Sequence, residues 1–141
     1  DVPPAAIWQA WTVPELLMQW FTPAPWETIE CEIDLRPGGL FRTVMRSPEG
    51  EVLPEGKGCY LEVVENKKLV WTDALEANFR PCGKPNDCTD SYFTAMLLLE
   101  PHGDGGTKYT AVALHADEEG RKRHECQQHC RQKQYPRWKR P

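Results

Sequence analysis

Two histidines, His115 and His124, stand nine positions apart near the end of the chain, with Asp117 and Glu118 between them. Histidine changes charge near neutral pH, so a histidine beside a carboxylate can act as a general base, and two histidines can bind a metal ion. The alternative is structural, with His115 ending a strand and His124 facing solvent. His115 and Asp117 are the weak candidates for catalysis, and no nucleophile with an obvious partner accompanies them.

The cysteines offer a second set of chemically active side chains. Cys126 and Cys130 are one helical turn apart beside His129, and thiolate and imidazole are good zinc ligands. A structural zinc site usually joins two separate elements, however, and no second ligand pair is evident, so we predict no metal and no cofactor. Cys82 and Cys88 could form a disulfide on oxidation, but we expect free thiols.

Aromatic side chains are concentrated in the early helical segments and in the strands, and most of them should form the core. Large flat rings are also suited to line an apolar cavity. We predict that such a cavity is lined by Trp20, Phe41, Trp71, Phe93 and Tyr109.

Arg36 lies in the stretch Arg36-Pro37-Gly38-Gly39, which separates two segments of alternating apolar and polar residues. Proline fixes φ and glycine permits positive φ, so this stretch predicts a hairpin turn. The guanidinium of Arg36 is predicted to meet an anionic group of a ligand at the cavity mouth. The alternative is a surface ion pair with Asp34 or a glutamate.

The elements that must position these residues follow from periodicity. Apolar residues at helical spacing predict two short helices, the first from Pro4 and the second after Thr12, which is expected to cap it together with Glu15. Alternation with a period of two predicts six strands, at about 27–35, 40–46, 57–65, 68–75, 91–100 and 107–116.

The connections between these strands are mostly too short for helical crossovers, which predicts an antiparallel meander. Residues 76–90 are the exception and read as a long irregular loop, while a charged helix is expected from Asp117. The fold class is therefore α+β, with a curved antiparallel sheet that buries one face against the last helix. A cavity of roughly 300–1,000 Å³ is common in such an arrangement.

Composition limits the function further. The 141 residues suit one domain, and no apolar signal segment or membrane span is seen, so a soluble, cytoplasmic protein with reduced thiols is expected. Residues 1–120 hold 20 acidic and 9 basic side chains, whereas residues 121–141 hold 1 acidic and 8 basic. The acidic body argues against nucleic-acid binding, and the lack of a run of eighteen apolar residues argues against membrane insertion.

Several motifs occur in an order that resembles a known family: WQAWTVPELLMQWF, DLRPGGLFRTVMRSPEG, GKGCYLEVVENKKLVWTDAL, FRP and GGTKYTAVALHADEEGRKRHE. Together they resemble the bacterial family related to the activator of heat shock protein 90 ATPase. That family belongs to the helix-grip superfamily, which includes START domains and polyketide cyclases (SRPBCC). The resemblance implies a seven-stranded sheet around a long C-terminal helix, with a hydrophobic cavity between them.

The resemblance also has two departures. It covers residues 5–125, so we divide the chain into a helix-grip ligand-binding domain, 1–125, and an atypical basic tail, 126–141. The family's first strand would precede Asp1 and pair with 107–116, which leaves that strand as an edge. We expect either that a preceding segment covers this edge or that a second chain pairs there to form a homodimer.

For function, the resemblance implies binding of a small hydrophobic or aromatic ligand. A cyclase- or dehydratase-like enzyme using the same cavity is the first alternative, and a co-chaperone that stimulates a heat shock protein 90 ATPase is the second. The sequence lacks a clear acid–base pair for an enzyme, and the fold alone does not supply one. The ligand-binding hypothesis is therefore the leading one.

Overall fold

The computed structural model describes residues 2–83 and 91–125. Its helices and strands are, in chain order, α1 (Pro4–Thr12), α2 (Pro14–Leu17), β1 (Glu27–Ile33), β2 (Leu40–Arg46), β3 (Gly56–Val64), β4 (Lys68–Thr72), β5 (Leu75–Glu76), the 3₁₀ turn η1 (Ala77–Phe79), β6 (Arg80–Pro81), β7 (Phe93–His102) and β8 (Gly106–His115). A further helix, of which residues 118–125 are described, follows β8.

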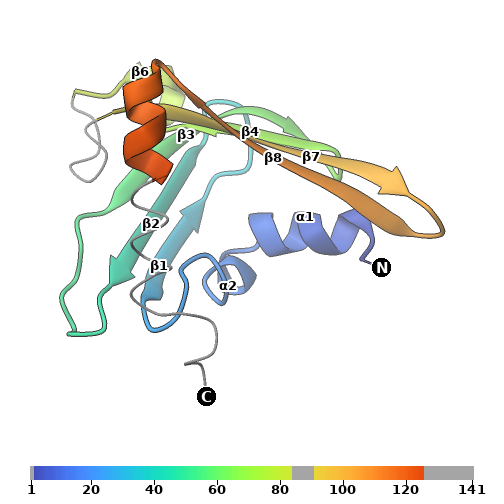
Figure 1. The fold of residues 1–141 in the computed structure, drawn as a ribbon, viewed down its shortest axis with the longest axis horizontal. Coiled ribbons are helices and arrows are strands. Elements are labelled where there is room, and N and C mark those ends of the chain that lie inside the picture. The colour runs from blue at the N-terminus through green and yellow to red at the C-terminus, as the bar shows by residue number, and fades with distance from the viewer. Residues whose placement is uncertain (1, 84–90, 126–141) are drawn as a thin grey trace.

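Six strands form one antiparallel sheet in the order β1-β2-β3-β4-β7-β8. The sheet curls, and α1 and α2 lie against its concave side (Figure 1). The α+β architecture and the meander predicted from the sequence are thus confirmed. The main sheet of the described residues has six strands, where the resemblance implied seven. Residues 76–81 of the predicted loop, together with Leu75, form the small β5–β6 ribbon around η1.

The turn predicted at Arg36–Gly39 is confirmed as the β1–β2 hairpin. The Asp34 amide donates to the Leu40 carbonyl at 2.8 Å, and the Gly39 amide donates to the Arg36 carbonyl at 2.8 Å. Gly38 has a φ of +79°, which favours glycine, and a Cβ on Gly39 would lie 1.8 Å from the Asp34 carbonyl oxygen. The local backbone therefore requires both glycines.

The start of α2 differs from the expectation. The position before its first residue is Val13, and no side chain caps the helix there. Thr12 instead ends α1, where its hydroxyl donates to the Trp8 carbonyl at 2.8 Å. The predicted capping box of Thr12 and Glu15 is therefore wrong, because α1 includes Thr12 and the Thr12 hydroxyl bonds within that helix.

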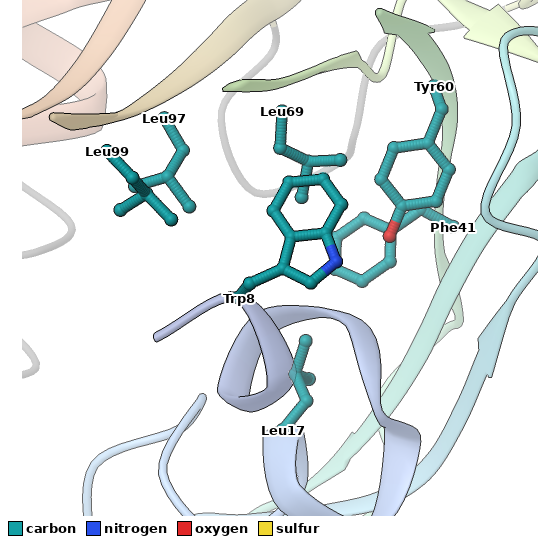
Figure 2. Packing of buried hydrophobic residues seen from close by; sticks show 7 residues of the cluster. All are labelled: Trp8, Leu17, Phe41, Tyr60, Leu69, Leu97 and Leu99. Carbon is teal, nitrogen blue, oxygen red and sulfur yellow. The ribbon is translucent and has the colours of Figure 1, made fainter. Parts of the chain in front are cut away.

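The hydrophobic core lies between α1, α2 and the concave face of the sheet (Figure 2). Trp8 of α1 and Leu17 of α2 meet residues of four strands, which are Phe41, Tyr60, Leu69, Leu97 and Leu99. Both helices begin with a proline at the first turn, where its missing N–H leaves no hydrogen bond unmade. Two very short helices therefore suffice to hold large side chains against the sheet.

Strand β8 is the last strand of the sheet that the described residues form, as expected for residues 107–116. All ten of its residues pair with β7, and at its beginning the Thr107 hydroxyl donates to the Val2 carbonyl at 2.7 Å. What covers its outer edge stays a prediction.

The helix predicted from Asp117 is present. The Asp117 carboxylate accepts a hydrogen bond from the Gly120 amide at 2.7 Å, which caps the first turn of residues 118–125. The predicted tail, 126–141, lies outside the described residues, so the boundary between domain and tail stays a prediction. Within the described part, no helix is long and apolar enough to cross a bilayer.

We expect Leu17→Ala to lower the free energy of unfolding by about 2–5 kcal/mol, because Leu17 is 0% exposed and its loss leaves a cavity under the sheet. The neighbouring Leu16→Ala is the matched control, since Leu16 is 38% exposed and should cost less than about 1 kcal/mol. Urea unfolding followed by tryptophan fluorescence measures both. Equal losses would show that α2 is not part of the core.

Candidate functional site

The candidate site lies on the concave face where β7 and β8 run side by side. Residues directly opposite in an antiparallel pair project to the same face. Ala111 pairs with the core residue Leu97, and Ala113 pairs with Ala95. Ala111 and Ala113 therefore face the concave side, yet both are exposed. They form an open strip of small side chains, which we call the alanine strip.

One end of the alanine strip is bounded by an aromatic cluster centred on Trp11 of α1. The Trp11 ring lies 4.7 Å from the Trp20 ring and 5.3 Å from the Trp71 ring, between centroids. Phe41 continues the cluster, with its ring 5.8 Å from that of Trp71. Three of the predicted lining residues are thus brought together, and Trp11, which we had not selected, joins them.

Tyr109 stands at the same end, since it precedes Ala111 on the concave face of β8 and pairs with Leu99. Its side chain is 44% exposed. Burial of part of the ring raises the pKa of the Tyr109 phenol, while a hydrogen bond with the Trp11 side chain acts in the opposite direction. Tyr109 therefore connects the aromatic cluster to the alanine strip.

Phe93 and His115 mark the other end, where they pair across β7 and β8 with their ring centroids 6.2 Å apart. His124 of the following helix completes this group: its Nδ1 lies 3.1 Å from Nε2 of His115, and its ring lies 5.0 Å from that of Phe93. Phe93 is thus separated from the other predicted lining residues and belongs to a histidine cluster.

Asp73, in the turn after β4, lies beside the histidine cluster of Phe93, His115 and His124. One carboxylate oxygen accepts a hydrogen bond from the Phe93 amide at 2.8 Å. Burial raises the pKa of Asp73, and the nearby His115 charge and backbone hydrogen bonds partly oppose this. The other oxygen, Oδ2, and Nδ1 of His115 are buried without a hydrogen-bond partner in the described structure.

The second predicted catalytic residue, Asp117, has a local role. Its carboxylate caps the helix through the Gly120 amide, and the side chain is exposed. The histidine cluster brings together His115, His124 and Asp73, and Asp73 was missed because it comes from a turn distant in sequence. Among residues 2–83 and 91–125, no three ligand-type side chains are close enough to hold a metal ion.

Arg36 lies beside the β1–β2 turn, where its guanidinium forms an ion pair with Asp34 at 2.8 Å. Both side chains are about half exposed. This is the surface ion pair that we gave as the alternative to ligand binding. No contact of the described residues therefore supports the prediction that Arg36 binds an anionic group of a ligand.

A separate open groove of about 600 Å³ lies between α2, the segment after it and the start of β1. Its lining includes Met18, Trp26 and Ile29, with Glu15 and Arg46 at its edges. None of the six predicted ligand-binding residues lines this groove. It is therefore distinct from the candidate site on the concave face.

Comparison with known proteins agrees with the fold. A family model described as "Activator of Hsp90 ATPase homolog 1-like protein" matches residues 1–136. A solved structure from Nitrosomonas europaea is 44% identical, with a TM-score of 0.81 over 92% of this chain and 78% of that chain.

Two further solved structures are more distant. One from Rhodobacter sphaeroides is 25% identical, with a TM-score of 0.71 over 89% of this chain and 74% of that one. One from Mycobacterium smegmatis is 27% identical, with a TM-score of 0.63 over 91% and 74%. No curated protein matches the sequence.

We expect Asp73→Asn to become increasingly stabilising as the pH rises from about 4 to 7. The raised pKa means that the folded protein favours the protonated carboxyl, so its contribution to stability is present at low pH and is lost as the carboxyl ionises. The amide keeps an oxygen for the Phe93 amide but carries no charge. Chemical unfolding across this pH range measures the difference between the variant and the wild type.

Asp104→Asn is the matched control for this measurement, because Asp104 is an exposed turn carboxylate. Its stability relative to the wild type should change little with pH. A pH-independent difference for Asp73→Asn would show that burial does not penalise the Asp73 charge.

Proposed function

The chain belongs to the family of activator of Hsp90 ATPase homolog 1-like proteins and has the helix-grip fold, and we propose that it binds a small hydrophobic or aromatic ligand on the alanine strip. The ligand lies between the sheet and the helix that follows β8. The observation that carries this proposal is the exposure of Ala111 and Ala113 on a face that is otherwise packed with core residues. An apolar ligand is the chemistry that such a surface accepts.

The two ends of the strip define the shape of the ligand. Tyr109 and Trp11 form an aromatic wall at one end, and Phe93 with the histidines forms the other. Rings at both ends favour a flat or elongated apolar molecule. We keep Trp20, Phe41, Trp71, Phe93, Tyr109 and Arg36 as proposed ligand-binding residues and add Trp11.

The expected affinity follows from the area that a ligand would bury. Burial of about 300 Å² of apolar surface contributes roughly 7 kcal/mol, from which association costs of several kcal/mol are subtracted. Affinity is therefore modest unless polar groups contribute. No cofactor or metal is required for this function, and we propose that it operates in the cytoplasm.

We expect Ala113→Trp to abolish ligand binding, because the indole would fill the strip. Ligands come from a thermal-shift screen of lipids, flavonoids and polyketide-like aromatic compounds, followed by titration of tryptophan fluorescence. Leu114→Trp is the matched control, since Leu114 is the next residue of β8, faces the convex side and is 51% exposed. The control should bind as the wild type does.

Two results would contradict the proposal. The first is a screen in which no compound stabilises the folded protein. The second is a ligand that binds Ala113→Trp and the wild type equally, because that ligand would occupy another surface, such as the groove beside α2.

An enzyme is the second candidate, and the histidine cluster is the observation that favours it. His115 and His124 adjoin the strip, and an imidazole can move a proton during cyclisation or dehydration of a bound substrate. We expect His115→Asn to abolish turnover of a bound polyketide-like compound without changing its binding. Asp117→Asn tests the second predicted catalytic residue. Asparagine can still cap the helix, so a loss of turnover would indicate a role of the carboxylate beyond the cap.

A chaperone is the protein partner that the family's description suggests, and a homodimer through β8 is the expected assembly if a second chain covers that edge. Capture of an Hsp90-type chaperone from native lysate, followed by measurement of its ATPase rate, tests the first. Mass in solution tests the second. No nucleic acid is expected as a partner, because the described body is acidic.

A further inference from the structure

The contact between His115 and His124 joins strand β8 to the helix at residues 118–125. Beyond ligand binding, we propose that this pair is a proton-controlled latch between strand β8 and the helix at residues 118–125. The latch is closed while the pair carries at most one proton, and it opens when both imidazoles are protonated.

The geometry places the pair where a latch would act. His115 is the last residue of β8, and His124 lies near the end of the described part of the helix. Their facing nitrogens, Nε2 of His115 and Nδ1 of His124, are 3.1 Å apart, and the ring of Phe93 packs on both. The first turn of the helix is fixed separately, by the Asp117 cap and by Gly120 close to Ser91.

The chemistry of two facing imidazoles depends on the number of protons that they share. In a neutral pair, one ring donates its N–H to the lone pair of the other. One added proton keeps this arrangement, because one facing nitrogen can still accept. A second proton removes the acceptor and leaves two cations with ring centroids 5.0 Å apart. The contact then changes from attractive to repulsive.

Asp73 supplies a negative charge beside His115. Its carboxylate, held by the Phe93 amide, interacts electrostatically with His115 and is the charge that faces the pair from the β4–β5 turn. The negative charge of Asp73 offsets positive charge on the imidazoles. Because burial raises the pKa of Asp73, acidification weakens this balance as it adds protons to the pair.

Charged side chains of the helix form ion pairs along it. Arg121 pairs with Glu125 at 2.6 Å, and Arg123 pairs with Glu119 at 2.7 Å. These are exposed ion pairs within the helix, and each contributes little to its stability. The His115–His124 contact, with the ring of Phe93 beside it, is therefore a proton-sensitive contact between this helix and the sheet.

The test measures amide hydrogen exchange of the full chain, under reducing conditions, from pH 8 to about pH 4.5 with correction for intrinsic rates. Histidine side chains ordinarily gain a proton near pH 6.5, so the acidic end of this range tests the doubly protonated pair. We expect the protection of residues 118–125 to fall at least about tenfold at the acidic end of this range. Protection of β3 and β4 should stay constant, which distinguishes opening of the helix from global unfolding.

His124→Phe is the decisive variant, because it keeps an aromatic ring beside Phe93 and His115 but cannot be protonated. Its helix should show no pH-dependent loss of protection. His115→Phe is a second variant with the same expectation, in case the first does not fold. His102→Gln, at the exposed far end of β7, is the control and should retain the wild-type profile.

Two outcomes would overturn the proposal. In the first, the wild-type helix keeps its protection relative to β3 and β4 across the whole range. In the second, His124→Phe or His115→Phe loses protection at the same pH and to the same extent as the wild type. Both outcomes are independent of whether the alanine strip binds a ligand.

Discussion

Coverage of the concave face of the sheet is the constraint on which the rest of this structure depends. Six curled strands present one continuous apolar face, and water must be kept from it. Trp8 and Leu17 do so for the centre of the sheet, where they meet β2, β3, β4 and β7. Helix α1 has nine residues and spans only about 14 Å. It therefore covers part of β7 and leaves β8 to be covered by something else.

Charged pairs mark the opposite, convex face of the sheet as its solvent side. Lys108 and Glu100 pair across β7 and β8 at 2.9 Å, and Arg42 of β2 pairs with Glu30 of β1 at 2.6 Å. Exposed pairs of this kind each contribute less than about 1 kcal/mol. These pairs help to fix the register of the strands, because a slip of one residue would bury these charges and expose the core side chains. This register keeps the core side chains on the concave face along most strands.

The strands and hairpins were predictable because periodicity and turn residues are local signals, as the Arg36–Gly39 turn shows. The end of α1 was not, since the Thr12 hydroxyl could either accept from an amide of the next helix or donate to the Trp8 carbonyl, as it does here. The site was predictable in part: aromatic residues on neighbouring strands had to meet. The proximity of Asp73 to His115 depends on the register of β4, β7 and β8 and on the turn after β4, which no short stretch of sequence encodes.

The distribution of side-chain size along β8 is the strongest argument that the uncovered region is a site. On its convex face this strand carries Val112 and Leu114, and Leu114 is 51% exposed. On its concave face it carries Ala111 and Ala113, where a strand built only for stability would place its larger apolar residues. Small residues facing inward create depth between the sheet and whatever covers it. Because such depth costs stability unless it is filled, an apolar molecule of the kind proposed above would account for both faces of the strand.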